Sequence, residues 1–424
     1  MSPPGEGDAG QGGFLAPGAR SDAPRTGGVV STEPLGAPTI GSGQFTPAFL
    51  DDLRHAGDPP ADAAVARFFD ATKAQHSELF RRLARSSTGV PDEDLPGVGK
   101  FVTALEPWPD WADSRLVRHG QRVFGEWGPQ LCMGLWMASL PADYACAKGA
   151  EPLARTARLT RSPKRRYVET GQMIIDAMTP DALEPGGRGY LTVRHVRLMH
   201  AAVRHVLLNS SEIADSETTP VEPWDDALGV PLNQEDLLGC LFSFSVVGIQ
   251  SLRRSGVRLR ERDAEAYIHA WNLIGHQIGI RPGLLPLDWA DAKALWDRIC
   301  VLEYAPSDAG RELTAAAISC MQQLIESRRL RGLPATGIRH YLGDETADLL
   351  GVPPADWTRA FFTFVQETDN IVGRVLALVP GTHSITGALG RRMLRGFELF
   401  ERDGDRPGFE ITDELKQAWG MATP

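Results

Sequence analysis

Apolar residues recur every three to four positions along nearly the whole of this chain, and alternation of apolar and polar residues, the pattern of a strand, is rare. Proline and glycine gather between the periodic segments, for example at 180–189 and 281–286, where connections between helices belong. The sequence therefore predicts an all-α fold. The predicted helices cover residues 61–85, 113–127, 131–148, 162–178, 191–208, 233–256, 263–280, 287–302, 309–331, 355–379 and 385–402.

The first 44 residues differ from the rest, because they contain 11 glycines and 6 prolines and show no apolar periodicity. Such a segment cannot bury enough apolar surface to fold, so we predict a disordered tail over residues 1–44. Thr46 followed by Pro47 predicts the start of the first helix, since threonine caps helices and proline suits the first turn. Residues 45–424 are predicted to form one all-α domain.

The composition excludes several classes of protein. A formal net charge of −10 argues against a nucleic-acid partner, whose phosphates require a basic face. No apolar run reaches the roughly 18 residues of a transmembrane segment. The N-terminus shows no secretory pattern, so we expect a cytoplasmic protein. The 5 cysteines form no CxxC pair and are expected to be reduced thiols.

The segment 191–208 combines an apolar helix with basic side chains. Arg197, His200 and Arg204 share one helix face, because they are spaced by three and four residues. Cationic groups on a core helix are costly unless something anionic meets them. Haem fits this pattern, since its iron accepts an imidazole nitrogen and its propionates accept hydrogen bonds from arginine. The alternative is a core histidine with arginines that pair with Asp or Glu elsewhere.

Two further segments hold candidate polar residues. Arg166 and Thr170 lie one turn apart on a predicted helix and border its apolar face, so they are candidates to point into a pocket. The alternative is a surface ion pair between Arg166 and Glu169. Glu151 lies near the end of an apolar helix, where a lone glutamate is usually a surface group.

Motifs of other enzyme classes are missing from the sequence. It contains no HExxH zinc pattern, no GxSxG elbow, no phosphate-binding glycine loop and no DDxxD magnesium clamp. The sequence therefore favours no metal site other than the one that His200 suggests.

Taken together, these segments resemble the rubber oxygenase (latex-clearing protein) and MpaB-like family. The resemblance rests on Arg197-Leu-Met-His200-Ala-Ala-Val-Arg204, on Arg165-Arg166-Tyr-Val-Glu-Thr170 about thirty residues earlier, and on the stretches 233–245 and 267–279. It covers roughly residues 95–330. Each piece is modest, but their order and spacing are fairly specific.

The resemblance implies a globin-like helical core with additional helices and a haem b cofactor. His200 matches the iron ligand, and Arg197 and Arg204 match arginines on the same haem-facing helix. Arg166 and Thr170 match residues on the side where oxygen meets the substrate, and Glu151 lies near the family's candidate base. Members of the family add O₂ across an isoprenoid carbon–carbon double bond and release two carbonyl fragments.

The chain departs from the rubber-cleaving branch at two points. Glu169 stands where that branch carries a lysine that can reach the iron. The expected export signal is also missing, so a small intracellular isoprenoid or polyene is a better expected substrate than solid polymer.

Three alternatives to a cleaving oxygenase remain at this stage. They are a non-catalytic haem or oxygen sensor, a haem monooxygenase or peroxidase-like tailoring enzyme, and a haem-free helical scaffold. The sequence predicts no oligomeric state.

Overall fold

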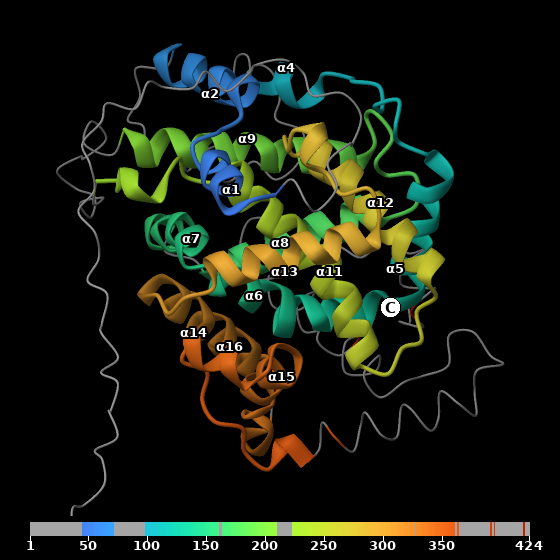
Figure 1. Ribbon diagram of the computed structural model, residues 1–424, viewed down its shortest axis with the longest axis vertical. Helices are drawn as coiled ribbons and strands as arrows, with labels where there is room; N and C mark the ends of the chain where they lie inside the picture. The colour runs from blue at the N-terminus through green and yellow to red at the C-terminus, as the bar shows by residue number, and fades with distance from the viewer. Residues whose placement is uncertain are drawn as a thin grey trace, which may run out of the picture. The chain divides into compact units, whose positions relative to one another are not determined.

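The computed structural model describes residues 45–71, 98–160, 163–209, 223–325 and 327–360, together with residues 363, 391, 394 and 419. Every regular element within these ranges is a helix, which confirms the predicted all-α class (Figure 1). The predicted tail over 1–44, most of the predicted helix at 355–379 and the predicted helix at 385–402 lie outside the described residues, apart from single positions.

The described helices follow one another along the chain. Their bounds are α1 Pro47–Leu53, α2 Pro59–Ala71, α4 Val98–Thr103, α5 Ser114–Gly134, α6 Leu140–Ala145, α7 Ala147–Thr160, α8 Pro163–Met178, α9 Arg188–Leu208, α11 Gln234–Arg254, α12 Glu261–Gln277, α13 Trp289–Glu303, α14 Asp308–Gln323, α15 Leu333–Leu342 and α16 Asp344–Leu349.

Helix starts agree with the capping residues in the sequence. The Thr46 hydroxyl accepts a hydrogen bond from the Phe49 amide at 3.2 Å and begins α1, as predicted. Asn233 and Asp236 form a reciprocal capping box at the start of α11. That box fixes the first turn of α11, whose later turns line the candidate site.

The prediction was wrong between residues 113 and 160. In place of helices at 113–127 and 131–148, α5 continues through Pro129, and a π-helical turn, η2, follows at Leu135–Ser139. The helix then ends at Cys146, and α7, which was not predicted, begins directly after it. Proline and a break in periodicity usually end a helix, but here buried packing on both sides of Pro129 stabilises its continuation.

Packing between helices positions the site. α5 lies along α12, while α8 and α2 both lie along α9 (Figure 1). α11 packs against α5, α12 and α13, and most of its buried side chains after the first turn are apolar. α9, which carries the histidine of interest, therefore has α8 against one part of its surface and α2 against another.

One described helix is long and apolar enough to cross a membrane by length and composition, namely α11, Gln234–Arg254. However, 83% of its most apolar window is buried inside the protein, as expected for a core helix.

Candidate functional site

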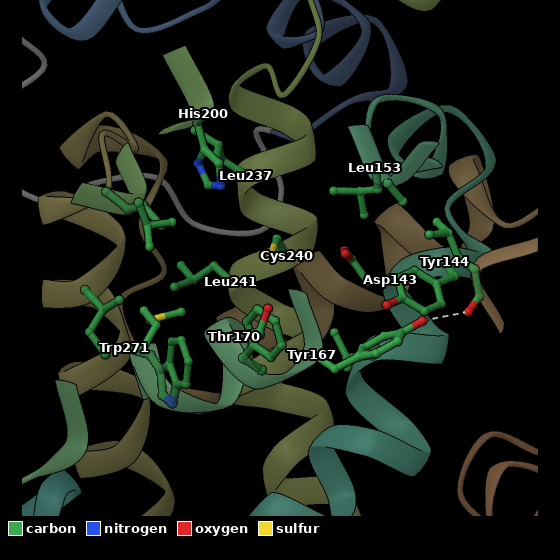
Figure 2. Close-up of a pocket in the computed structure, with 18 residues that line it drawn as sticks. Asp143, Tyr144, Leu153, Tyr167, Thr170, His200, Leu237, Cys240, Leu241 and Trp271 are labelled. Carbon is green, nitrogen blue, oxygen red and sulfur yellow. Dashed lines mark hydrogen bonds between the residues drawn. The ribbon is translucent and has the colours of Figure 1, made fainter. Parts of the chain in front are cut away.

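A cavity opens between helices α6, α7, α8, α9, α11, α12 and α14, each of which contributes side chains to its wall (Figure 2). Its volume is about 130 Å³, whereas one water molecule needs roughly 10–15 Å³ by the same measure. Voids of that size are rare in close-packed interiors. The lining residues are Leu140, Asp143, Tyr144, Leu153, Ala157, Tyr167, Thr170, Met173, Val196, His200, Leu237, Cys240, Leu241, Phe244, Trp271, Ile274, Ile278 and Leu313.

His200 reaches this cavity from α9. It lies one turn after Val196, which also lines the cavity, so the spacing of four residues places both on one face. Figure 2 shows the imidazole entering the space beside Leu237 of α11. The structure thus places the histidine predicted from sequence at an apolar cavity.

Thr170 reaches the same cavity from α8, as Figure 2 shows. Tyr167 and Met173, three residues to either side of it, complete this face of the helix. The Tyr167 hydroxyl donates a hydrogen bond to the Leu313 carbonyl at 2.9 Å, which anchors α8 to α14. The Thr170 hydroxyl is therefore held at a defined place in the wall.

Two of the predicted neighbours of Thr170 are not in the wall. The side chain of Arg166 lies outside the described residues, so its predicted role stays a prediction. Glu169 is exposed and is not among the lining residues.

Glu151 is held away from the cavity by an ion pair. Its carboxylate accepts a hydrogen bond from Arg155 Nε at 3.2 Å, and its side chain is 29% exposed. Arg155 also donates to the Pro223 carbonyl at 3.0 Å and stacks on Trp224. Among the described lining residues the carboxylate is Asp143, which sequence reasoning missed because nothing in its local pattern distinguishes it.

Arg197 and Arg204 meet aspartates of the segment that opens α2. Arg197 Nε and Nη2 donate to the two carboxylate oxygens of Asp58 at 2.6 and 2.8 Å. Arg204 Nε donates to Asp62 at 2.7 Å, and its Nη1 donates to the Leu232 carbonyl at 2.9 Å. This matches the alternative that the spacing left open, pairing with acids elsewhere, and neither arginine is among the lining residues.

Burial alone would lower the pKa of Arg197, but the hydrogen bonds and the charge of Asp58 raise that pKa overall. Arg204 still has one buried donor, Nη2, without a hydrogen-bond partner. A buried guanidinium with an unused donor is able to take an anionic group in addition to Asp62.

A buried charge cluster lies at the start of α11, one turn from the cavity wall at Leu237. Arg54 Nη1 lies 2.5 Å from a Glu235 carboxylate oxygen and 3.1 Å from one of Asp236. Lys148 Nζ forms a salt bridge with the Glu303 carboxylate at 2.9 Å. Burial, with the neighbouring Asp236 and Glu303, raises the pKa of Glu235 to about 8. We call these five residues the α11 charge cluster.

No group of three or more His, Cys, Asp or Glu side chains able to hold a metal ion occurs within the described residues. All five cysteines are free thiols, and Cys240 lines the cavity. The imidazole of His200 in the cavity wall is a donor of the kind that holds iron in a haem site with one protein ligand.

The described part of the protein is all-helical, and the imidazole of His200 lies in the wall of its apolar cavity. The family described as "ER-bound oxygenase mpaB/B'/Rubber oxygenase, catalytic domain" matches residues 121–368. This match spans more than half of the chain, and the chain belongs to that family of oxygenases.

Two relatives agree with this assignment. The Rubber oxygenase of Streptomyces sp. (strain K30) is 25% identical over 373 residues, which cover 85% of this chain and 87% of the relative. The solved structure of Latex Clearing Protein LCP in the closed state matches with a TM-score of 0.63 at 21% identity, over 85% of this chain and 95% of LCP. The match to the LCP structure shows that the two chains share a fold.

Proposed function

We propose that this protein is a haem b-dependent oxygenase that cleaves a carbon–carbon double bond of an isoprenoid or polyene with O₂. The observation that carries the proposal is the placement of His200 in the wall of an apolar cavity, within a chain of the rubber oxygenase family. The predicted globin-like core and the single domain over 45–424 belong to this proposal and stay predictions.

The residues present fit a haem group. A flat apolar macrocycle needs an apolar space beside an imidazole, and the cavity provides both. His200 would hold the iron. Arg204, one turn further along α9, has a buried Nη2 donor without a hydrogen-bond partner, which suits a propionate. Arg197 is predicted to assist, although Asp58 already takes two of its donors.

When bound, haem b supplies the iron that activates dioxygen. The chain's own residues provide the surroundings. Leu241, Phe244 and Ile274 keep water from the reacting atoms and receive an alkene by hydrophobic contact. The Thr170 hydroxyl offers a hydrogen bond to negative charge that develops on oxygen. Arg166 is predicted to add a second donor there, and Glu151 was predicted to act as base.

The walls support a neutral unsaturated hydrocarbon as the substrate. Most lining side chains are aliphatic or aromatic, and the contacts they offer are non-directional. The names of the relatives refer to rubber and latex. For this chain we propose an isoprenoid or polyene small enough to enter the cavity.

The visible spectrum of the purified protein tests the haem assignment. We expect a Soret band in the wild type, and we expect His200→Ala to lose or displace it. The matched control is His205→Ala on the same helix, whose ring stacks on Phe69 at 4.4 Å between centroids and which does not line the cavity. Pigment that His200→Ala leaves unchanged would refute the ligand assignment.

Products formed under ¹⁸O₂ from an isoprenoid alkene such as squalene test the reaction. Cleavage places one labelled oxygen on each carbonyl fragment. A single labelled hydroxyl on an intact chain would instead identify a monooxygenase, and a pigmented protein without any product would identify a sensor.

A further inference from the structure

Helix α5 continues through a proline that would normally break it. Pro129 lies inside the helix and is buried. Because proline has no N–H, it cannot bond the carbonyl four residues back, which belongs to Gly125, and its ring crowds that carbonyl. A carbonyl that loses its helical partner inside a packed protein costs free energy, so a donor from outside the helix is expected at Gly125.

The indole of Trp419 supplies this donor. Its Nε1 donates a hydrogen bond to the Gly125 carbonyl at 3.0 Å, although the two residues are 294 positions apart. Trp419 is only 3% exposed, and its ring meets Phe124 edge to face with 5.9 Å between the ring centroids. The indole N–H therefore takes the place of the amide that Pro129 lacks.

Gly128 provides the space for the indole ring. A Cβ atom at this position would overlap Trp419 Cζ2 and would lie 2.7 Å from its Nε1. A side chain at 128 and the indole at its observed position therefore exclude each other. We call Phe124, Gly125, Gly128 and Pro129 the α5 notch.

The α5 notch lies just before the part of the chain that forms one side of the cavity. After Pro129, α5 leads into η2 and then into α6, which contributes Leu140 and Tyr144 to the cavity wall. Trp136 of η2 also meets Tyr167, a further wall residue, edge to face at 5.3 Å between centroids. The course of α5 at Pro129 therefore determines where these wall residues lie.

We propose that the α5 notch is a docking site for an indole ring and that Trp419 acts there as a latch on the cavity wall. Docked Trp419 keeps α5 helical through Pro129 and holds η2 and α6 in place. Undocked, it leaves the Gly125 carbonyl without its donor, and residues 130–144 open more readily. The inference goes beyond the proposed function, because it holds whether or not the protein cleaves an alkene.

The alternative is that Trp419 is an ordinary core residue. A residue that only fills space destabilises the whole fold when it is removed, and that cost does not depend on the residue at 129. The latch predicts instead a local opening at 130–144, an incompatibility with any side chain at 128, and a hydrogen bond whose value depends on Pro129. Each prediction is tested separately in the full-length protein.

Hydrogen exchange measured by mass spectrometry tests the local opening. We expect Trp419→Gly to speed exchange at 130–144 by about tenfold or more, while α2 keeps its wild-type rates. Free indole, which fits the space that this substitution vacates, should restore slow exchange at 130–144. Indole should leave the wild type unchanged there, which separates docking in the notch from uptake by the cavity. Trp357→Gly, at a tryptophan that is 58% exposed, is the matched control and should behave as the wild type.

The fit at Gly128 is tested by a change of sign. In the wild type, Gly128→Ala brings a methyl group into the indole and should lower the folding equilibrium constant, measured in urea, by about tenfold or more. In the Trp419→Gly background it should raise that constant by about fivefold, because alanine favours a helix more than glycine does. Gly239→Ala on α11 is the matched control, since a Cβ there would lie 3.9 Å from Ile299 Cγ2, and its effect should be the same in both backgrounds.

The hydrogen bond is tested by combining Trp419→Phe with Pro129→Ala. Phenylalanine keeps a buried ring but cannot donate, so loss of the hydrogen bond in Trp419→Phe should lower the folding equilibrium constant by about tenfold. In the Pro129→Ala background the alanine amide supplies a donor to the Gly125 carbonyl. The same substitution should therefore cost about tenfold less there.

Three results would each contradict the latch. They are exchange at 130–144 that stays within about twofold of the wild type in Trp419→Gly, exchange in that variant that indole does not slow, and an equal cost of Trp419→Phe with and without Pro129→Ala. If the Trp419→Gly chain fails to fold, the combination of Trp419→Phe with Pro129→Ala decides, because both substitutions keep the core filled.

Discussion

At the scale of single residues, the cavity combines few polar groups with many apolar ones. His200 and Thr170 arrive from different helices, α9 and α8, and both face the same space (Figure 2). The wall beside them is made of carbon, for example Met173, Val196 and Leu241. In such surroundings a single hydroxyl dipole acts more strongly on developing charge than it does in water.

Thr170→Val is therefore expected to lower the cleavage rate by about tenfold to a hundredfold. Valine keeps the shape of the wall and removes only the hydroxyl. Steady-state oxygen consumption with an alkene measures the effect, and Thr170→Ser, which restores the hydroxyl, is the control. Equal rates for the valine and serine variants would show that the hydroxyl plays no part in the reaction.

At the scale of elements, helix α9 borders an apolar cavity and also forms ion pairs. His200 reaches an apolar cavity, while Arg197 and Arg204, one turn to either side of it, pair with Asp58 and Asp62. The acids lie four residues apart and the arginines seven, so the two ion pairs join α9 to the start of α2 at two successive points. These ion pairs fix the rotation of α9 and hence the direction of the imidazole.

Asp58→Asn should reduce the free energy of unfolding by about 3 kcal/mol, because it leaves the Arg197 guanidinium buried without its counter-charge. Urea denaturation measures this loss. Asp297→Asn, which breaks a pair between half-exposed side chains of Lys293 and Asp297, should change stability by less than about 0.5 kcal/mol. An unchanged stability of Asp58→Asn would mean that Arg197 has another anionic partner, as the haem prediction requires.

Local pattern was sufficient to predict α8, α9, α11 and α12 to within a few residues, since each presents apolar spacing and clear boundaries. It also singled out His200 and Thr170, which lie in the cavity. The break at η2 and the position of Asp143 could not be predicted, because a π turn depends on tertiary packing rather than on a residue signal.

At the scale of the whole molecule, the decisive contacts join segments that are remote in the sequence. Arg197 and Asp58 are 139 positions apart, and Arg54 and Glu235 are 181 apart. The spacing of basic residues along one helix indicates that they need acidic partners. It does not indicate which acidic residues form the ion pairs.

The α11 charge cluster makes stability depend on pH. It holds three carboxyl groups, Glu235, Asp236 and Glu303, against the two cations Arg54 and Lys148. Burial raises the pKa of both Glu235, to about 8, and Asp236, so folding favours the protonated form of this carboxyl pair. Segments that are remote in the sequence, from Arg54 to Glu303, meet here, so global unfolding reports on it.

A carboxyl whose pKa is raised on folding binds its proton more tightly in the folded state. Its contribution to stability is then complete below the ordinary pKa of 4.5 and is lost as pH rises to about 8. Each unit of difference corresponds to about 1.4 kcal/mol. We expect the free energy of unfolding to fall by about 2 kcal/mol or more between pH 5 and pH 8.

Glu235→Gln should flatten this dependence, since glutamine presents a neutral polar group at every pH. Urea unfolding at a series of pH values measures it, and Glu261→Gln, at an exposed position in the first turn of α12, should reproduce the wild-type curve. A wild-type stability that rises from pH 5 to pH 8 would mean that Glu235 is ionised in the folded protein. In that case Arg54 would form an ion pair with a charged Glu235 carboxylate, and Glu235 would carry no proton.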